Sequence, residues 1–188
     1  MGEVKRGLII FILFSILTGL IYPFFIAGIG QILWKEKANG SLVKKENVVI
    51  GSKLLGQNFS NPRYFHGRPS YVDYKGSISG ASNLGPTSKK LFENASRQIN
   101  LIRNENNLSA DYKIPADLIL ASASGLDPHI SLDSALLQAN RIANTRGINI
   151  DEVKRLIHKN LEEPQFKLLG QKRINVLNLN LALDEISK

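Results

Sequence analysis

The chain has 188 residues, of which 43% are hydrophobic, and a formal net charge of +8. This length suits one folded domain of about 150 residues beside a short accessory segment. The chain contains no cysteine, which excludes a lipoprotein anchor and a cysteine pair for a metal, and fits either side of a membrane. The basic residues are dispersed and accompany no nucleic-acid motif, so we expect no nucleic-acid partner.

An apolar run from Gly7 to Leu33 contains no charged residue. A helix needs about 20 such residues to cross a hydrocarbon core, so residues 1–34 are predicted to be a membrane anchor that spans from about 8 to 33. The alternative is a cleaved signal peptide, whose apolar region has only about 7–15 residues. Pro23 is expected to kink the helix because it removes one backbone hydrogen bond. Tyr22 and Trp34 suit the membrane interface.

Charge leaves the orientation of this anchor open. Basic residues lie on both sides of it: Lys5 and Arg6 before the run, and Lys35, Lys37, Lys44 and Lys45 after it. A count of these charges alone would place the rest of the chain inside the cell, but long domains translocate regardless of charge.

Residues 35–188 are predicted to form one soluble α/β (α+β) domain. Val48 to Ile50 predict a buried strand that ends at Gly51. The turn-rich stretch 61–86 contains aromatic residues and is therefore expected to be an ordered loop rather than a disordered linker. Residues 87–107 predict a helix that Thr87 or Ser88 caps, with an apolar stripe at helical spacing formed by Leu91, Ala95, Ile99 and Ile102.

The C-terminal part of the domain is predicted to alternate between helix and sheet. Ser131 is expected to cap a helix that ends at Gly147. Asn149 and Glu152 resemble a capping box that opens the next helix, which buries Val153, Leu156, Ile157 and Leu161. Four leucines alternate with other residues from Leu177 to Leu183, and this period of two predicts a half-buried strand.

The loop 124–129 contains residue types that occur in hydrolases. Ser124, Asp127 and His129 form a candidate functional loop, although Ser122 stands where a nucleophile elbow requires glycine. The alternative is structural, with Asp127-Pro128 forming a turn before the helix at Ser131. His66 and His129 lie in separate loops with no spacing that demands a metal, so no metal site is predicted.

Two glycine-containing segments are candidates for phosphate binding. Gly51 and Gly56 have the glycine spacing of a P-loop, but Gln57 stands where the lysine is required, so we reject this interpretation. The Ser/Gly-rich stretch 77–86 exposes backbone amides just before a predicted helix N-terminus, which suits an anion. The alternative is a loop whose Ser and Asn residues only turn the chain.

The chain resembles the C subunit of the Kdp-type potassium-transporting P-type ATPase over nearly its whole length. The resemblance begins at Tyr22-Pro23 in the apolar run. It continues through motifs at residues 51–59, 62–70, 79–87, 115–118, 124–131, 146–147 and 175–184, for example Ser124-Gly125-Leu126-Asp127-Pro128-His129 and Asn175-Val176-Leu177.

This resemblance implies a non-catalytic subunit of a potassium-uptake pump in the cell membrane. Its partners would be the potassium-translocating and ATP-hydrolysing subunits, together with membrane lipid. The resemblance further implies assembly of the pump, a role as a catalytic chaperone that raises ATP affinity, and a soluble domain outside the cytoplasm.

The resemblance also implies site residues. ATP, in complex with the ATP-hydrolysing subunit, would contact Ser79, Gly80, Ser82 and Asn83, and Ala81 stands where the family usually has glycine. The residues of the anchor that are expected to serve its membrane and partner contacts are Gly7, Gly19, Tyr22, Pro23, Gly28 and Gly30. Its glycines allow close approach of other helices, and the alternative is that they merely face lipid. Two other hypotheses stay open, namely a tethered extracytoplasmic enzyme that uses Asp127 and His129, and an independent nucleotide-binding module.

Overall fold

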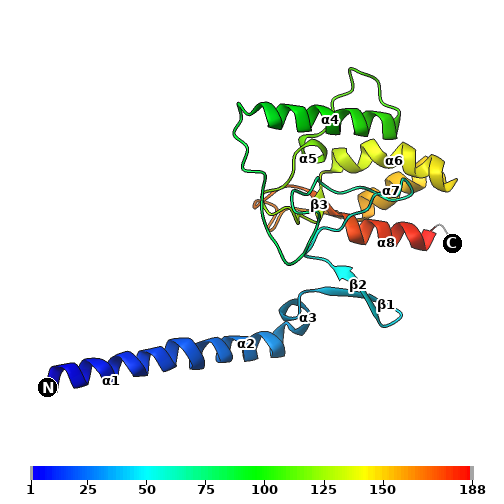
Figure 1. Ribbon diagram of the computed structural model, residues 1–188. Coiled ribbons are helices and arrows are strands. Elements are labelled where there is room, and N and C mark those ends of the chain that lie inside the picture. The colour runs from blue at the N-terminus through cyan, green and yellow to red at the C-terminus, as the bar shows by residue number, and fades with distance from the viewer. Residues whose placement is uncertain (1, 187–188) are drawn as a thin grey trace. The chain divides into compact units, whose positions relative to one another are not determined.

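The computed structural model describes residues 2–186, and the chain forms two compact units, one up to Ile50 and one from Gly51 on. Segment 35–50 therefore groups with the N-terminal helix. Figure 1 shows the order of the elements along the chain.

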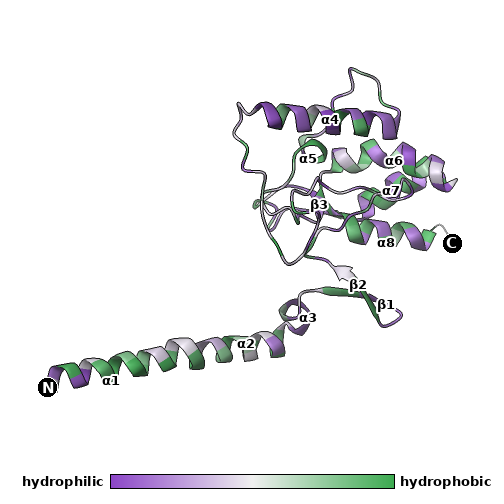
Figure 2. Ribbon diagram, viewed as in Figure 1, coloured by the Kyte–Doolittle hydropathy of each residue, from purple (hydrophilic) through white to green (hydrophobic). Residues whose placement is uncertain are grey.

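The N-terminal unit begins with one continuous apolar helix. It consists of α1 (Gly2–Ile16), a π-helical turn (Leu17–Ile21) and α2 (Tyr22–Leu33). The span Gly2–Leu33 has a mean hydropathy of 2.5 in its most apolar window, long and apolar enough to cross a membrane. In Figure 2 green, the colour of hydrophobic residues, recurs along the length of this helix. None of the most apolar window is buried within the chain, so the helix needs lipid or other helices as its surroundings.

The helix is irregular just before its proline. The π-helical turn ends two residues before Pro23, and the Tyr22 amide donates to the Leu17 carbonyl, five residues earlier. Proline has no N–H to continue the regular ladder, and π turns are one of the recognised ways in which a helix absorbs such an interruption. The backbone therefore departs from regular α-helix close to the position that the sequence predicted.

A short helix and a two-stranded hairpin follow the long helix. They are α3 (Lys35–Ala38), β1 (Leu42–Lys45) and β2 (Val48–Ser52). Glu46 and Asn47 form the turn with positive φ angles of 51° and 65°, as a tight hairpin turn requires. The predicted strand at Val48 to Ile50 was confirmed as β2, but its predicted burial was wrong, because Val48 is 64% exposed and Val49 is 50% exposed. A two-stranded ribbon has no second layer of its own that would cover these side chains.

The larger unit packs helices around a small antiparallel sheet. Its helices are α4 (Lys89–Asn106), α5 (Ala116–Ile119), α6 (Leu132–Arg146), α7 (Ile150–Lys159) and α8 (Val176–Ile186). Its strands are β3 (His129–Ile130), β4 (Leu161–Glu162) and β5 (Arg173–Asn175), in the spatial order β3-β5-β4. The structure therefore confirms an N-terminal apolar helix followed by an α+β region.

The core lies between these helices and the sheet. Ile174 of β5 pairs with Ile130 of β3 and with Leu161 of β4. Ile174 has no exposed surface, and the other fully buried apolar residues come from the loop before α4 and from α6, α7 and α8: Phe65, Ala135, Ile142, Val153, Ile157, Leu179 and Leu183. Burial of each large apolar side chain contributes roughly 1.5–3 kcal/mol to the stability of this core.

The helices α4, α6 and α7 lie where the sequence predicted them, but the Ser88 side chain makes no capping bond to α4. Leu161, predicted as a buried residue of α7, lies beyond its end, in β4, and is only partly buried. Ser131 caps α6 by accepting a hydrogen bond from the Ser134 amide, and Gly147 ends it with a φ of +68°. Asn149 begins α7, but its side chain accepts from the Asp151 amide at 2.8 Å, so the cap is an Asx turn. In α4 only Ile102 of the predicted stripe is fully buried.

The predicted strand at residues 177–183 was wrong, because this segment is α8. Val176, Leu179, Asn180 and Leu183 are buried at helical spacing of three and four residues. The Asn175 side chain accepts a hydrogen bond from the Asn178 amide at 3.1 Å and so caps the first turn. The alternation of leucines fits a strand equally well by sequence, and tertiary packing decides for the helix.

The long loop before α4 is attached to the helices by side-chain amides. Gln138 of α6 accepts from the His66 amide at 2.8 Å and donates to its carbonyl at 3.1 Å. Asn180 of α8 makes the equivalent pair of bonds with Phe65. These bonds satisfy buried backbone groups that have no strand neighbour, and they hold the following residue pair, Gly67 and Arg68, close to the sheet.

Candidate functional site

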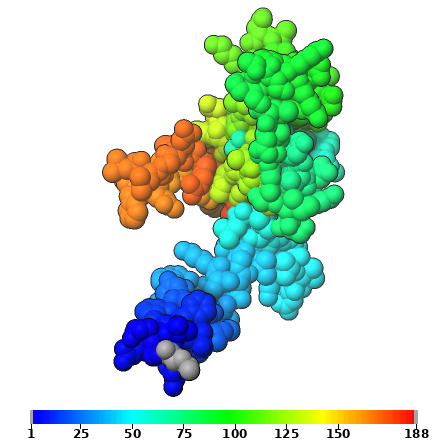
Figure 3. All heavy atoms as spheres, turned by 60° about the vertical axis from the view of Figure 1, so that its left-hand side comes forward, coloured from blue at the N-terminus to red at the C-terminus, as the bar shows by residue number. Residues whose placement is uncertain are grey.

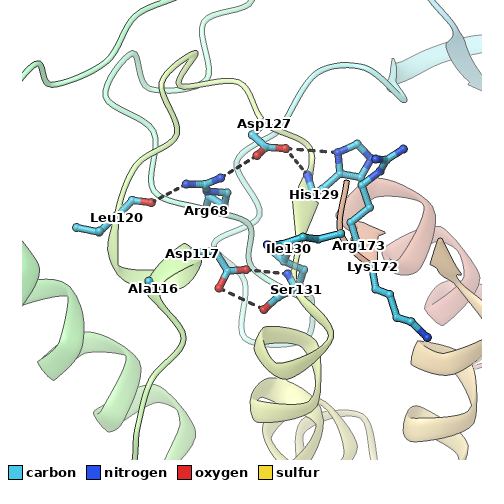
Figure 4. A pocket seen from close by; sticks show the side chains of 11 residues that line it. Arg68, Ala116, Asp117, Leu120, Asp127, His129, Ile130, Ser131, Lys172 and Arg173 are labelled. Carbon is cyan, nitrogen blue, oxygen red and sulfur yellow. Dashed lines mark hydrogen bonds and ion pairs between the residues drawn. The ribbon is translucent and has the colours of Figure 1, made fainter. Parts of the chain in front are cut away.

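A cavity of the larger unit is open to solvent and lies beside β3 and α5. Its volume is about 650 Å³. Figure 4 shows its side chains, which come from the long loop, α5, β3 and the segment before β5. The lining residues are Arg68, Ala116, Asp117, Leu120, Asp127, His129, Ile130, Ser131, Gln171, Lys172 and Arg173.

Asp127 is the centre of the polar side of this cavity. Its Oδ2 accepts from Arg68 Nη1 at 2.9 Å, and its Oδ1 lies 3.4 Å from His129 Nδ1 and accepts from the His129 amide at 3.0 Å. In Figure 4 the Arg68 and His129 side chains converge on the Asp127 carboxylate. Burial opposes ionisation of this carboxylate, but the bonds from His129 and Arg68 outweigh it and lower the pKa of Asp127 to about 2, so it is ionised at neutral pH.

Charges of opposite sign alternate around the same cavity. His129 Nε2 lies 3.9 Å from a carboxylate oxygen of Glu162, and Arg173 Nε lies 3.1 Å from that oxygen. Arg68 Nη2 also approaches the Leu120 carbonyl at 3.5 Å. The His129 ring thus lies between two ion pairs, Arg68–Asp127 and Arg173–Glu162, and within each pair the charges compensate one another.

Asp117 connects α5 to the start of α6. It accepts from the Ser131 amide at 2.7 Å, from the Ser131 hydroxyl at 3.3 Å and from the Ser134 hydroxyl at 2.6 Å. The nearest serine hydroxyls therefore donate to a carboxylate rather than to His129. A base within reach of a hydroxyl is what activates a serine nucleophile, so this arrangement suits positioning of the helix better than nucleophilic chemistry.

Of the three residues predicted as a functional site in the loop 124–129, Asp127 and His129 come together, and Ser124 does not join them. Ser124 Oγ accepts from the Leu126 amide at 3.1 Å and lies 3.4 Å from Ser122 Oγ. Its side chain therefore shapes its own turn, while Asp127 and His129 face the cavity. A functional role for these three residues stays a prediction.

The predicted nucleotide segment packs against the same turn. The Gly80 amide and the Ser79 hydroxyl both donate to the Ser124 carbonyl, at 2.9 Å and 3.3 Å. Ser82 lines a separate cavity of about 240 Å³ with Ser70, Tyr71 and Arg97 among its neighbours. Asn83 has a left-handed φ of 51°. Two donors of the segment are thus already used within the chain, and contact with a nucleotide stays a prediction.

The histidines lie in different environments. His66 Nδ1 is 3.4 Å from Glu105, His129 belongs to the cavity, and His158 is exposed on α7. Burial, together with the nearby Arg141 charge, lowers the pKa of His66 despite Glu105. Within residues 2–186 no three His, Asp or Glu side chains are grouped as metal ligands.

The site residues that sequence reasoning missed are Arg68, Asp117, Glu162 and Arg173. Arg68 and Asp127 are 59 positions apart in the chain, and no local pattern connects them. Arg68 and Asp117 do lie within motifs that carry the family resemblance, at 62–70 and 115–118. Their place in these motifs was the one feature of the sequence that could have pointed to them.

The glycines of the apolar helix leave open surface on that helix. A methyl group on Gly7, Gly19 or Gly28 would meet nothing within 4 Å, whereas on Gly30 it would lie 3.9 Å from Ala38 Cβ. Tyr22 is 61% exposed and Trp34 is 55% exposed within the chain. The predicted partner face of this helix is thus sterically accessible, and its occupant stays a prediction.

Comparison with known proteins finds similarity along almost the whole chain. The model of the family "K+-transporting ATPase, c chain" matches residues 4–185. The potassium-transporting ATPase KdpC subunit of Mycobacterium tuberculosis is 42% identical over 186 residues, covering 98% of each chain. The KdpC subunit of Caldanaerobacter subterraneus is also 42% identical, over 99% of this chain and 97% of its own, and that of Rhodopseudomonas palustris is 40% identical over 99% and 98%.

Proposed function

Because the chain belongs to the KdpC family, the c chain of K+-transporting ATPases, we propose that it is a non-catalytic accessory subunit that assembles and stabilises a potassium-uptake pump. The observation that carries this proposal is the family match over residues 4–185. It includes both the apolar helix and the larger unit, so the whole architecture is that of the family.

The potassium-translocating and ATP-hydrolysing subunits of the same pump are the proposed partners. From Gly7 to Leu33 the helix contains no charged residue, and no residue of α1 or α2 is buried within the chain. Small residues such as Gly7, Gly19 and Gly28 allow other helices to approach closely in a membrane, and the remaining surface would contact lipid. The helix is thus the proposed element of attachment in the membrane.

We place the larger unit outside the cytoplasm, which follows the family resemblance and agrees with the rule that long segments translocate regardless of charge. Cytosolic ATP does not reach that side. A rise in ATP affinity of the pump would then arise through contact with a partner subunit, by stabilising its ATP-binding conformation. The bonds of Ser79 and Gly80 to the Ser124 carbonyl favour this indirect route over direct contact with ATP.

A pull-down with potassium-stimulated ATP hydrolysis as readout tests the proposal. The tagged full chain is expressed with its native membrane partners and solubilised gently, and the retained proteins are identified. We expect a large ATPase to be retained with its activity. A matched control replaces residues 7–33 by an unrelated apolar helix of equal length, which keeps the membrane anchor and should lose the ATPase.

Recovery of the chain alone, from a membrane that contains such a pump, would contradict the accessory role. Turnover by the isolated chain that disappears in His129→Ala would instead support the tethered enzyme. Saturable ATP binding by the chain without partners, weakened by Asn83→Asp, would support the nucleotide-binding module.

A further inference from the structure

The loop between β4 and β5 presents apolar side chains to solvent on a fixed backbone. We call residues 163–172 the tip loop. Gln165 and Leu169 form an antiparallel bridge, with N···O distances of 3.0 and 2.9 Å in the two directions. Phe166 and Lys167 have left-handed φ angles of 53° and 62°, which non-glycine residues adopt uncommonly and at a cost in free energy. In Figure 3 the orange part of the larger unit projects outward.

The tip loop carries the two most exposed large apolar side chains of the described larger unit, and a third lies beside them. Phe166 is 87% exposed, Leu168 is 86% exposed and Leu169 is 62% exposed. Single exposed apolar residues are ordinary on a protein surface, whereas a contiguous group is typical of a contact site. Local hydrogen bonds hold this group in one shape, and a fixed shape favours a partner with a fixed complementary surface.

The charges around the tip loop favour a protein over a lipid surface as its partner. Lys172 pairs with Glu163 at 2.8 Å, and Arg173 pairs with Glu162 at 3.1 Å. The base of the loop is therefore neutral, whereas anionic lipid surfaces are recognised by clusters of about 4–8 Lys and Arg residues. Among residues 2–186 no carboxylate lies within ion-pair distance of Lys167, so one ammonium group stands free between Phe166 and Leu168.

We propose that the tip loop docks into an apolar cleft of a neighbouring pump subunit, with an acidic side chain at the rim of that cleft bound to Lys167. This inference rests on the proposed function, since it names the surface by which the accessory subunit holds its partner outside the membrane. Phe166 and Leu168 fill the cleft, and Lys167 fixes the orientation by pairing with the acidic group.

Site-specific photocrosslinking in the assembled pump tests the docking surface. A photoreactive benzoylphenylalanine replaces Phe166 in the tagged full chain, and a matched variant carries it in place of Phe92, which is 62% exposed on α4. We expect position 166 to form an adduct with a peptide of another pump subunit, identified by mass spectrometry. The yield at position 92 should be lower by about tenfold, as for a position outside a contact centre.

Substitutions provide the second arm of the test. The double variant Phe166→Ser/Leu168→Ser and the variant Lys167→Glu should each lower the fraction of pump retained through detergent washes by about tenfold. Lys167→Arg and Phe92→Ser should leave it unchanged. Since the substituted side chains are mostly exposed, thermal unfolding of every variant should match that of the parent chain.

Three outcomes would overturn this inference: adducts of position 166 with lipid alone, equal adduct yields at positions 166 and 92, or retention that the tip-loop variants leave unchanged. In each of these cases the unmodified chain still retrieves the pump, so only the docking surface is wrong. Failure of the unmodified chain to retrieve any pump subunit contradicts the proposed function instead.

Discussion

The guanidinium of Arg146 lies over the ring of Tyr64, with Cζ 4.8 Å from the ring centroid. Arg146 also donates to Asp184 at 2.8 Å and to the Arg63 carbonyl at 2.7 Å, while the Tyr64 hydroxyl donates to the same carboxylate at 3.2 Å. The last turn of α6, the long loop and α8 therefore meet at one arginine side chain, which is only 3% exposed.

Replacement of Arg146 by alanine is expected to destabilise the larger unit by about 2–4 kcal/mol, because it removes a partly buried ion pair and the stacking on Tyr64. Arg146→Lys should recover only part of this loss, since an ammonium lacks the planar fork. Urea unfolding of the full chain in detergent measures the effect. The exposed Arg155→Ala is the control, and an equal loss in both variants would contradict the role of the buried contacts.

Asn180→Ala should cost about 2–4 kcal/mol of unfolding free energy. The reason is that both backbone groups of the buried Phe65 lose their partner and remain without a hydrogen bond. Asn94→Ala, on the exposed side of α4, should change stability by less than about 0.5 kcal/mol. Thermal unfolding compares the two variants, and similar midpoints would show that Asn180 is dispensable.

Acid should weaken the fold through Asp127. Its pKa falls from the ordinary value of 3.8 to about 2 in the folded chain, so its ion pairs stabilise the fold above pH 3.8 and are lost as pH falls toward 2. The contribution is on the order of 1–2 kcal/mol at neutral pH. Asp127→Asn should lower stability at pH 7 and have little effect near pH 2. A constant difference across this range, measured by denaturant unfolding, would contradict this expectation.

His66 should make stability depend on pH in a higher window. Burial and the Arg141 charge lower its pKa below 6.5 in the folded state. The unfolded chain therefore binds more protons than the folded one as pH falls below 6.5, and stability declines in that direction. His66→Gln should flatten this dependence in unfolding curves recorded between about pH 4 and 7. An unchanged slope in this variant would assign the effect to another group.

Gly56→Ala should disturb the Asp127 turn. A Cβ on Gly56 would lie 2.7 Å from the Asp127 carbonyl oxygen, whereas a Cβ on Gly85 would meet nothing within 4 Å. Because the nearest atoms are backbone, relief requires movement of the turn, at a cost of about 1–3 kcal/mol. Gly85→Ala is the matched control. Equal stability of the two variants, by thermal unfolding, would show that the turn adapts freely.

Local signals predicted much of the helical part of the fold. Ser131 and Gly147 define α6 because caps depend on residues near in sequence. The segment 177–183 was predicted as a strand because the spacing of its leucines fits both the period of a strand and that of a helix. Only the packing of Leu179 and Leu183 against the core decides for the helix. Val48 and Val49 have strand character, but burial depends on a second layer that the sequence does not encode locally.

The candidate site was predictable only in part. The spacing from Asp127 to His129 already placed these two side chains in one loop. Arg68 reaches Asp127 through the long loop, whose course depends on Gln138 of α6 and Asn180 of α8. Such a contact arises from the tertiary fold, and a single sequence carries no local trace of it.

The side-chain amides of Gln138 and Asn180 make part of the long loop before α4 unfold together with the core. Phe65 is bound by α8 and His66 by α6, so neither amide reaches solvent while both helices are in place. Hydrogen exchange at these two amides will therefore proceed by global unfolding, at the rate of the slowest helical amides. Arg68 follows these residues toward the cavity, and we expect it to be held in place as firmly as they are. The charged site should then persist until the whole unit unfolds, although it is built largely on a segment without regular secondary structure.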